Sequence, residues 1–121
     1  MKIIFIAGPY SGDRTKESIE RNIRIAEQYA LALSNKHIGF FCPHAHTEHF
    51  TSGKGSHAPE QFFYDMDIDI LKRCDAVLAV PGWEASRGAS NEIAWAKQNN
   101  LTIFYPKSTD DLGEVEKWYK G

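Results

Sequence analysis

Two short stretches in which every side chain is apolar constrain the fold more than any other feature of the sequence. They cover Ile3 to Ala7, and Ala76 to Val80 directly after Asp75. A strand with one face in water alternates polar and apolar residues, whereas a strand of a parallel sheet is covered on both faces and is apolar throughout. Both stretches therefore predict central strands of a parallel sheet.

Segments with helical periodicity separate the expected strands. Between Thr15 and Leu33, for example, apolar side chains recur every three or four residues. The full pattern predicts strands at 3–7, 37–42, 75–80 and 101–105, and helices at 15–33, 60–73, 88–99 and 112–119.

This alternation of strands and helices predicts an α/β fold. Strands joined through helices need right-handed crossovers and run parallel, and a chain of 121 residues is too short for a closed α/β barrel. We expect one doubly wound domain over residues 1–121, flavodoxin-like or Rossmann-like, with a four- to five-stranded parallel sheet and helices on both faces.

Composition narrows the expected partners to a small molecule. A net charge of −2 and scattered Lys and Arg residues provide no basic surface for a nucleic-acid polymer. No apolar run is long enough for a signal peptide or a membrane span, so we expect a cytoplasmic protein without a membrane partner. Cys42 and Cys74 stand alone in apolar contexts, so we expect both to be buried and reduced.

Doubly wound sheets bind ligands beyond the carboxyl ends of their strands, where the strand order reverses. The segments that follow the expected strands at this edge are 8–13, 43–49 and 81–88. A polar loop is expected from Pro43 to Pro59, and connections of this length in compact domains are usually functional or mobile.

The turn after the first strand is rich in glycine. Gly8 and Gly12 flank Pro9 and Tyr10, and such turns let backbone amides approach a ligand at the positive end of the next helix. The turn lacks both the Lys-Ser/Thr pair of a phosphate loop and the three glycines of a dinucleotide site. A plain connection between strand and helix explains it equally well.

The segment after the third expected strand carries a candidate anion site and a carboxylate. Ser86 suits a helix N-cap, and the first backbone amides of that helix, at Gly88 and Ala89, suit an anion such as phosphate. Glu92 lies one helical turn after Gly88, so we expect it to point into the same mouth. The alternative is an ordinary capped helix whose glutamate makes a surface ion pair.

Four acidic residues are candidates to partner Glu92: Asp65, Asp67, Asp69 and Asp75. Alternate acids cannot all share one helix face, so most of them must be solvated or act as caps. An inward acid beside Glu92 would form a carboxylate pair, the arrangement that cleaves glycosidic bonds. Periodicity does not distinguish which of the four turns inward.

The expected loop contains several histidines, namely His44, His46, His49 and His57. A zinc site is the alternative here, but we expect contacts with substrate or solvent instead, with no metal and no cofactor. The aromatic residues on which a base would stack are Tyr10, Phe62, Tyr64 and Trp83, although core packing explains Phe62 at least as well.

Three motifs together resemble the nucleoside 2-deoxyribosyltransferase-like superfamily. They are Phe5 to Gly12, the spacing from Asp67 to Asp75, and Pro81 to Gly88 ahead of Glu92. The likeness spans most of the chain and is nearest to small phage and bacterial members and to the deoxynucleoside 5′-monophosphate N-glycosidases. It implies a homodimer or larger homo-oligomer, because members of the superfamily usually complete their sites across subunits.

The resemblance also implies catalytic roles. Glu92 matches the carboxylate that attacks the anomeric carbon of the bound nucleotide. Asp67 lies eight residues before Asp75 and matches the acid that protonates or orients the departing base.

Binding roles follow from the same resemblance. Ser86 matches a serine of the monophosphate hydrolases, where transferases tend to carry an acid that would repel phosphate. The resemblance thus implies phosphate on Ser86, Gly88 and Ala89, and the sugar along Gly8, Pro9 and Tyr10.

Phe5 departs from the family pattern, because the enzymes usually carry a tyrosine there that hydrogen-bonds the nucleophile. Tyr10 or a loop histidine would have to substitute for that hydroxyl. The leading hypothesis is hydrolysis of the N-glycosidic bond of a (deoxy)nucleoside 5′-monophosphate. The alternatives are a nucleoside 2-deoxyribosyltransferase, a nucleotide-binding protein without turnover, and a metal hydrolase that uses the loop histidines.

Overall fold

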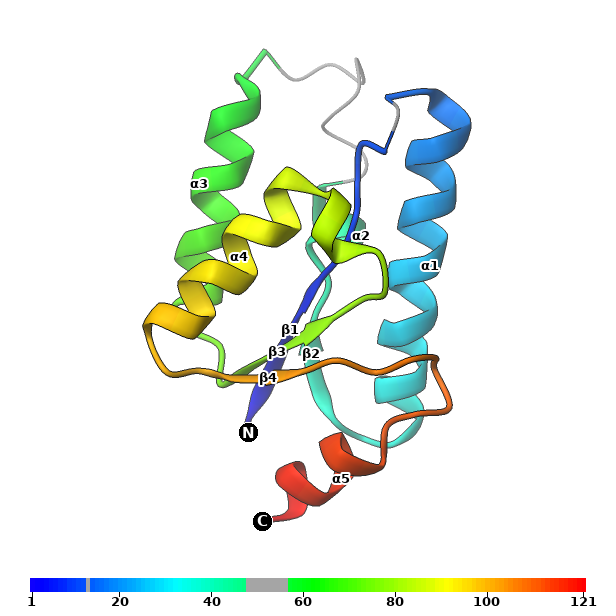
Figure 1. Ribbon diagram of the computed structural model, residues 1–121, viewed down its shortest axis with the longest axis vertical. Helices are drawn as coiled ribbons and strands as arrows, with labels where there is room; N and C mark the ends of the chain where they lie inside the picture. Colours follow the sequence, from blue (N-terminus) through cyan, green and yellow to red (C-terminus); the bar gives the residue numbers. More distant parts are fainter. Residues whose placement is uncertain (13, 48–56) are drawn as a thin grey trace.

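The structure is a computed structural model that describes residues 1–12, 14–47 and 57–121 (Figure 1). Its strands are β1 (Ile3–Ala7), β2 (Gly39–Phe41), β3 (Ala76–Ala79) and β4 (Thr102–Phe104). Its helices are α1 (Lys16–Asn35), α2 (Pro43–Thr47), α3 (Glu60–Leu71), α4 (Arg87–Gln98) and α5 (Gly113–Lys120), with a 3₁₀ turn, η1, at Trp83–Ala85.

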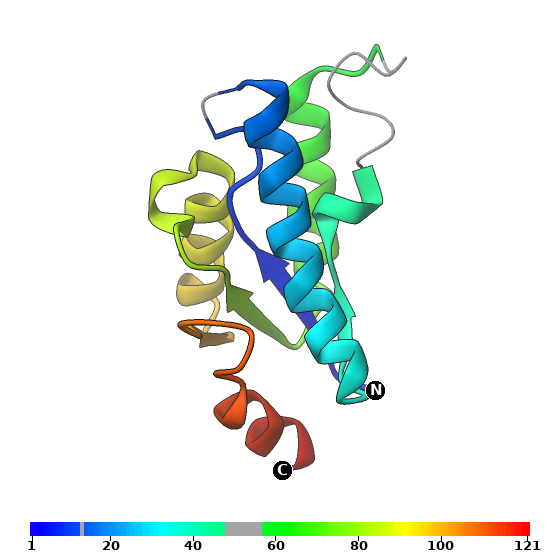
Figure 2. The same ribbon diagram turned by 90° about the vertical axis from the view of Figure 1, so that its right-hand side faces the viewer.

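The four strands form one parallel sheet in the order β2-β1-β3-β4. β1 and β3 are the central pair, in a register that runs from Ile4 opposite Ala76 to Ala7 opposite Ala79. Figure 2 shows the arrowheads of these two strands pointing to the same end of the molecule. The predicted fold class, a doubly wound α/β domain, is confirmed with four strands.

Alternate residues of the central strands build two separate cores. On one face Ile4 packs in a cluster with Leu33 of α1 and side chains of α5. On the other face Phe5 packs in a cluster with Leu71 of α3 and Ile93 of α4. Figure 1 shows the sheet between α1 on one side and α3 with α4 on the other. Because helices cover both faces, β1 and β3 contain no polar side chain.

Two expectations about local structure are wrong. The segment from Pro43 is not a loop throughout but begins with α2, because the Cys42 carbonyl accepts the N–H groups of Ala45 and His46. β2 begins at Gly39 because His37 has a φ of 59° and still belongs to the turn that ends α1. Of the two alternatives for Phe62, core packing does not hold, because its side chain is 52% exposed.

Cys42 and Cys74 are buried free thiols, as predicted. Among the described residues, no helix is long and apolar enough to cross a membrane.

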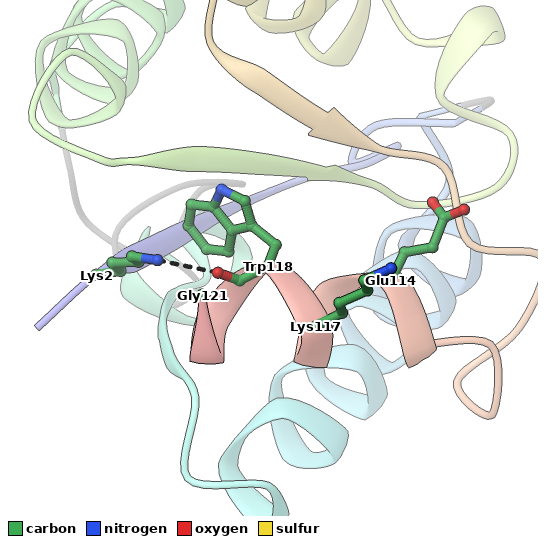
Figure 3. A pocket seen from close by; sticks show the side chains of 5 residues that line it. All are labelled: Lys2, Glu114, Lys117, Trp118 and Gly121. Atoms are coloured by element: carbon green, nitrogen blue, oxygen red, sulfur yellow. Dashed lines mark hydrogen bonds between the residues drawn. The ribbon is translucent and has the colours of Figure 1, made fainter.

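The helix α5 packs at the amino end of the sheet. Lys2 Nζ donates a hydrogen bond of 2.9 Å to the Trp118 carbonyl and lies 4.7 Å from the centre of the Trp118 ring (Figure 3). The Gly39 N–H donates to the Tyr119 hydroxyl at 3.4 Å. A shallow depression of about 640 Å³ lies here, lined by Lys2, Glu114, Lys117, Trp118 and Gly121. It is at the opposite end of the strands from the expected mouth.

Substitution of Gly8 tests the close contact between the turn after β1 and the end of β3. A Cβ atom at Gly8 would lie 2.8 Å from Val80 Cβ, and the Val80 N–H donates to the Ala7 carbonyl beside it. Gly8→Ala is therefore expected to lower the free energy of unfolding by about 1–3 kcal/mol, measured by urea denaturation. Gly113→Ala is the control, because its added Cβ would meet nothing within 4 Å. Equal stability of the two variants would contradict the prediction.

Candidate functional site

The site is at the carboxyl ends of β1 and β3, where the strand order reverses. After β1 the chain passes through α1 to β2 at one edge of the sheet, and after β3 it passes through α4 to β4 at the other edge. The two chain segments diverge at this point, which is where doubly wound sheets generally bind their ligands. The turns that begin at Gly8 and Pro81 therefore lie side by side at one edge.

The turn from Gly8 to Gly12 is held in place by side chains of the neighbouring helices. His44 Nε2 donates a hydrogen bond of 2.8 Å to the Pro9 carbonyl, and Asn22 Nδ2 donates one of 3.0 Å to the Tyr10 carbonyl. Gly12 has a φ of 53°, a conformation that strains residues with a side chain. The turn is thus a fixed wall of the site. Asp13 lies outside the described residues.

The amino end of α4 has the predicted cap. Ser86 Oγ accepts the N–H of Ala89 at 3.2 Å, and a left-handed Gly82, with a φ of 93°, turns the chain into η1. The cap already uses the Ala89 amide, which was expected to be available for phosphate. Among the described residues, the donors at this end without a partner are the hydroxyl proton of Ser86 and the N–H groups of Arg87 and Gly88.

Glu92 lies on the inner face of α4. It is only 8% exposed, so it is more enclosed than a side chain that points into an open mouth. Within the described part of the chain it has no ion pair and no hydrogen bond, which excludes the surface ion pair considered as the alternative. Burial raises the pKa of Glu92 well above its usual value of 4.5, and the nearby charge of Asp67 raises it further.

Asp67 is the acid that turns inward from α3. Asp65, Asp69 and Asp75 are exposed, and each has a polar partner: Gln61, Lys72 and the Ile3 N–H, respectively. Asp67 Oδ1, in contrast, is buried without a hydrogen-bond partner among the described residues. Burial raises the pKa of Asp67 from 3.8 to about 6. Asp67 and Glu92 together are called the carboxyl pair below.

The carboxyl pair suits proton transfer near neutral pH. Two like charges in an enclosed space disfavour double ionisation, so the pair keeps one proton over a wide pH range. One carboxyl can then donate a proton while the other attacks or stabilises a positive centre. The placement of the two side chains thus allows one carboxyl group to act as an acid and the other as a nucleophile or as a stabiliser of positive charge.

His44 has a different place from the one expected for a loop histidine. It is 5% exposed and packs beside Tyr10, with the two ring centres 5.8 Å apart. Its Nδ1 is buried without a hydrogen-bond partner in the described structure, and burial lowers its pKa. The neutral ring therefore donates through Nε2 and offers Nδ1 as an acceptor. In the sequence, the only signal for His44 is its position in a segment rich in histidine.

The other histidines that the structure describes do not form a metal-binding cluster with His44. His46 is exposed and contacts the Phe41 ring, His57 is exposed, and His49 lies outside the described residues. Among the residues that the structure describes, no three His, Cys, Asp or Glu side chains are arranged to hold a metal ion.

A second shallow depression, of about 420 Å³, lies beyond the ends of β3 and β4. Its lining is Ala79, Pro81, Gly82, Trp83, Glu84, Tyr105, Pro106 and Lys107. The rings of Trp83 and Tyr105 are 6.0 Å apart beside it. The carboxyl pair lines neither of these two depressions.

Fold and site together define the class: a flavodoxin-like α/β protein with a buried carboxyl pair at the point where the strand order reverses. The chain belongs to the family described as Domain of unknown function (DUF7768), which matches residues 2–106. The match covers the sheet and the carboxyl pair and ends before α5. A comparison with curated proteins finds no match.

The pH dependence of folding tests the environment of Asp67. A carboxyl whose pKa is raised by folding stabilises the native state below its unfolded pKa, and this contribution is lost as the pH rises through the folded value, here about 6. Asparagine cannot ionise, so Asp67→Asn does not lose this contribution. Its free energy of unfolding relative to that of wild type should therefore be about 1–2 kcal/mol higher at about pH 8 than at about pH 4.

Urea denaturation at the two pH values measures this gain. Asp65→Asn is the matched control, because Asp65 is exposed on the same helix. A gain that is the same for both variants would show that Asp67 is not in a desolvated site.

Proposed function

We propose that the protein hydrolyses the N-glycosidic bond of a (deoxy)nucleoside 5′-monophosphate. The observation that carries this proposal is the carboxyl pair, two enclosed acids with raised pKa values on adjacent helices at the ligand-binding edge of the sheet. Retaining glycosidases use two carboxyl groups in this way, one as nucleophile and one as acid and base. The resemblance of the sequence motifs to N-glycosidases points to the same chemistry.

In the proposed reaction a Glu92 carboxylate oxygen attacks the anomeric carbon of the sugar. The bond from that carbon to the base nitrogen breaks, its electron pair stays on the base, and Asp67 donates a proton to the base. Water then attacks the same carbon, gives its proton to Asp67 and releases Glu92 as a carboxylate. Both carboxyl groups return to their starting states.

Glu92 must be ionised for this attack, while Asp67 must hold the proton. In the structure Glu92 is the more enclosed of the two, and burial raises the pKa of both carboxyl groups. The proposed reaction requires the single proton of the pair to be on Asp67 once the substrate is bound. The developing positive charge of the sugar favours this distribution, because it stabilises a carboxylate beside the anomeric carbon.

The amino end of α4 is the proposed phosphate site. Ser86 has a hydroxyl proton to donate, and the Gly88 N–H lies in the first turn of a twelve-residue helix, whose positive end attracts anions. Gly8, Pro9 and Tyr10 would line the sugar, and the His44 Nδ1 atom offers an acceptor for one of its hydroxyl groups. By its resemblance to the superfamily the protein is also proposed to form a homodimer or larger homo-oligomer.

Nucleotide binding without turnover is the second candidate function. Phe5 is fully buried in the core on the α3 and α4 side of the sheet and has no hydroxyl to orient Glu92. Within the described residues, no other group hydrogen-bonds the Glu92 carboxyl. A site in which no hydrogen bond orients the Glu92 carboxylate would bind a nucleotide and leave its glycosidic bond intact.

Glu92→Gln tests the reaction, because it keeps the shape of the side chain and removes its nucleophilic charge. Wild type is expected to release free base from 5′-monophosphates faster than from nucleosides, and Glu92→Gln to be slower by about 10³-fold or more. Free base is measured by chromatography and nucleotide binding by calorimetry. Glu84→Gln is the control, since Glu84 is exposed in η1. Binding by wild type without base release would establish the second candidate function.

The pH profile of base release tests the role of Asp67. Its proton is required for departure of the base, so the rate should fall as the pH rises above about 6. Asp67→Asn should lower the rate by about 10²–10⁴-fold and abolish that limb of the profile. An unchanged limb in Asp67→Asn would assign the titration to another group.

A further inference from the structure

α3 and α4 meet in two layers of side chains. In the inner layer Asp67 lies near Glu92. One turn closer to the amino end of each helix, Tyr64 meets Gly88, where an added Cβ would lie 3.4 Å from Tyr64 Cε1. The amino ends of both helices lie toward the carboxyl edge of the sheet (Figure 1). The layer of Tyr64 and Gly88 is therefore between the carboxyl pair and the mouth of the site.

The Tyr64 ring is held from both ends. Gly88 has no side chain, so the ring can pack directly on the first turn of α4. At the other end the Tyr64 hydroxyl donates a hydrogen bond to Glu60, whose other oxygen lies 3.9 Å from Arg14 Nη1. Burial and the bond to Glu60 raise the pKa of Tyr64 to about 12, so the hydroxyl keeps its proton.

We propose that Tyr64 is a positioning residue that shields the carboxyl pair from water, and that Glu60 holds its ring over the pair. The low exposure of Glu92 and the unpartnered Asp67 Oδ1 both fit such a cover. Desolvation favours the neutral form of a carboxyl group, so a dry pair keeps its shared proton to a higher pH than a hydrated pair. A ligand that reaches the pair has to stack on the ring or displace it.

Charged side chains from three segments of the chain act on the Tyr64 side chain. Glu60 lies on the same helix as Tyr64, Arg14 belongs to the turn after β1, and Arg87 is the first residue of α4. The charged group that acts on Glu92 is Asp67. The strands β1 and β3 contribute no titratable side chain to either.

The experiment is a carbon-13 NMR titration of the Glu92 side-chain carboxyl without substrate, so it does not depend on the proposed reaction. Tyr64→Ala should lower the titration midpoint by about one pH unit or more, because water reaches the carboxyl. Glu60→Ala should shift it in the same direction by less. Glu60 is exposed, so this second variant tests the idea even if Tyr64→Ala fails to fold.

Phe62→Ala is the matched control, because it removes an aromatic ring of similar size that is exposed on the same helix. Its midpoint should equal that of wild type. A wild-type midpoint in every folded variant of Tyr64 and Glu60 would overturn the proposal. So would an equal shift in Phe62→Ala, which would indicate a general loosening of α3.

Discussion

The parallel pairing of β1 with β3 is the constraint on which the rest of the structure depends. Both strands are buried apart from the partly exposed Ile3, and their side chains alternate between two helical layers. Each layer needs helices to cover it, and the chain meets this need by sending α1 and α5 to one face and α3 and α4 to the other. The same pairing brings the turns at Gly8 and Pro81 together, so the packing of the core also fixes the place of the site.

Much of this arrangement could be predicted from the residues. The apolar runs that become β1 and β3, the spacing of α1, and the cap at Ser86 are local signals, and the structure has them where they were expected. The start of β2 was missed because a left-handed His37 leaves no mark in the hydrophobic pattern. The α2 helix was missed because one Cys42 carbonyl initiates it, within a segment whose composition is typical of loops.

The site was harder to predict than the fold because it depends on contacts between distant segments. Periodicity alone left four acids as equivalent partners of Glu92. The resemblance pointed to Asp67, and the packing of α3 on α4 separates Asp67 from its exposed neighbours. The degree of burial of Glu92, the unpartnered Nδ1 of His44 and the contact of Tyr64 with Gly88 have no signature in one sequence. Each arises from residues far apart in the chain.

The contacts of α5 have a practical consequence for work on this protein. They join Lys2, Gly39 and Trp118 at the amino end of the sheet, and both termini lie there, while the turn at Gly8 is at the other end (Figure 1). A five-residue strand separates the two ends by roughly 17 Å. A fluorophore, affinity handle or surface tether fused at either terminus thus lies away from the proposed ligand-binding edge, so immobilised protein can be used to test the proposed binding of nucleotides.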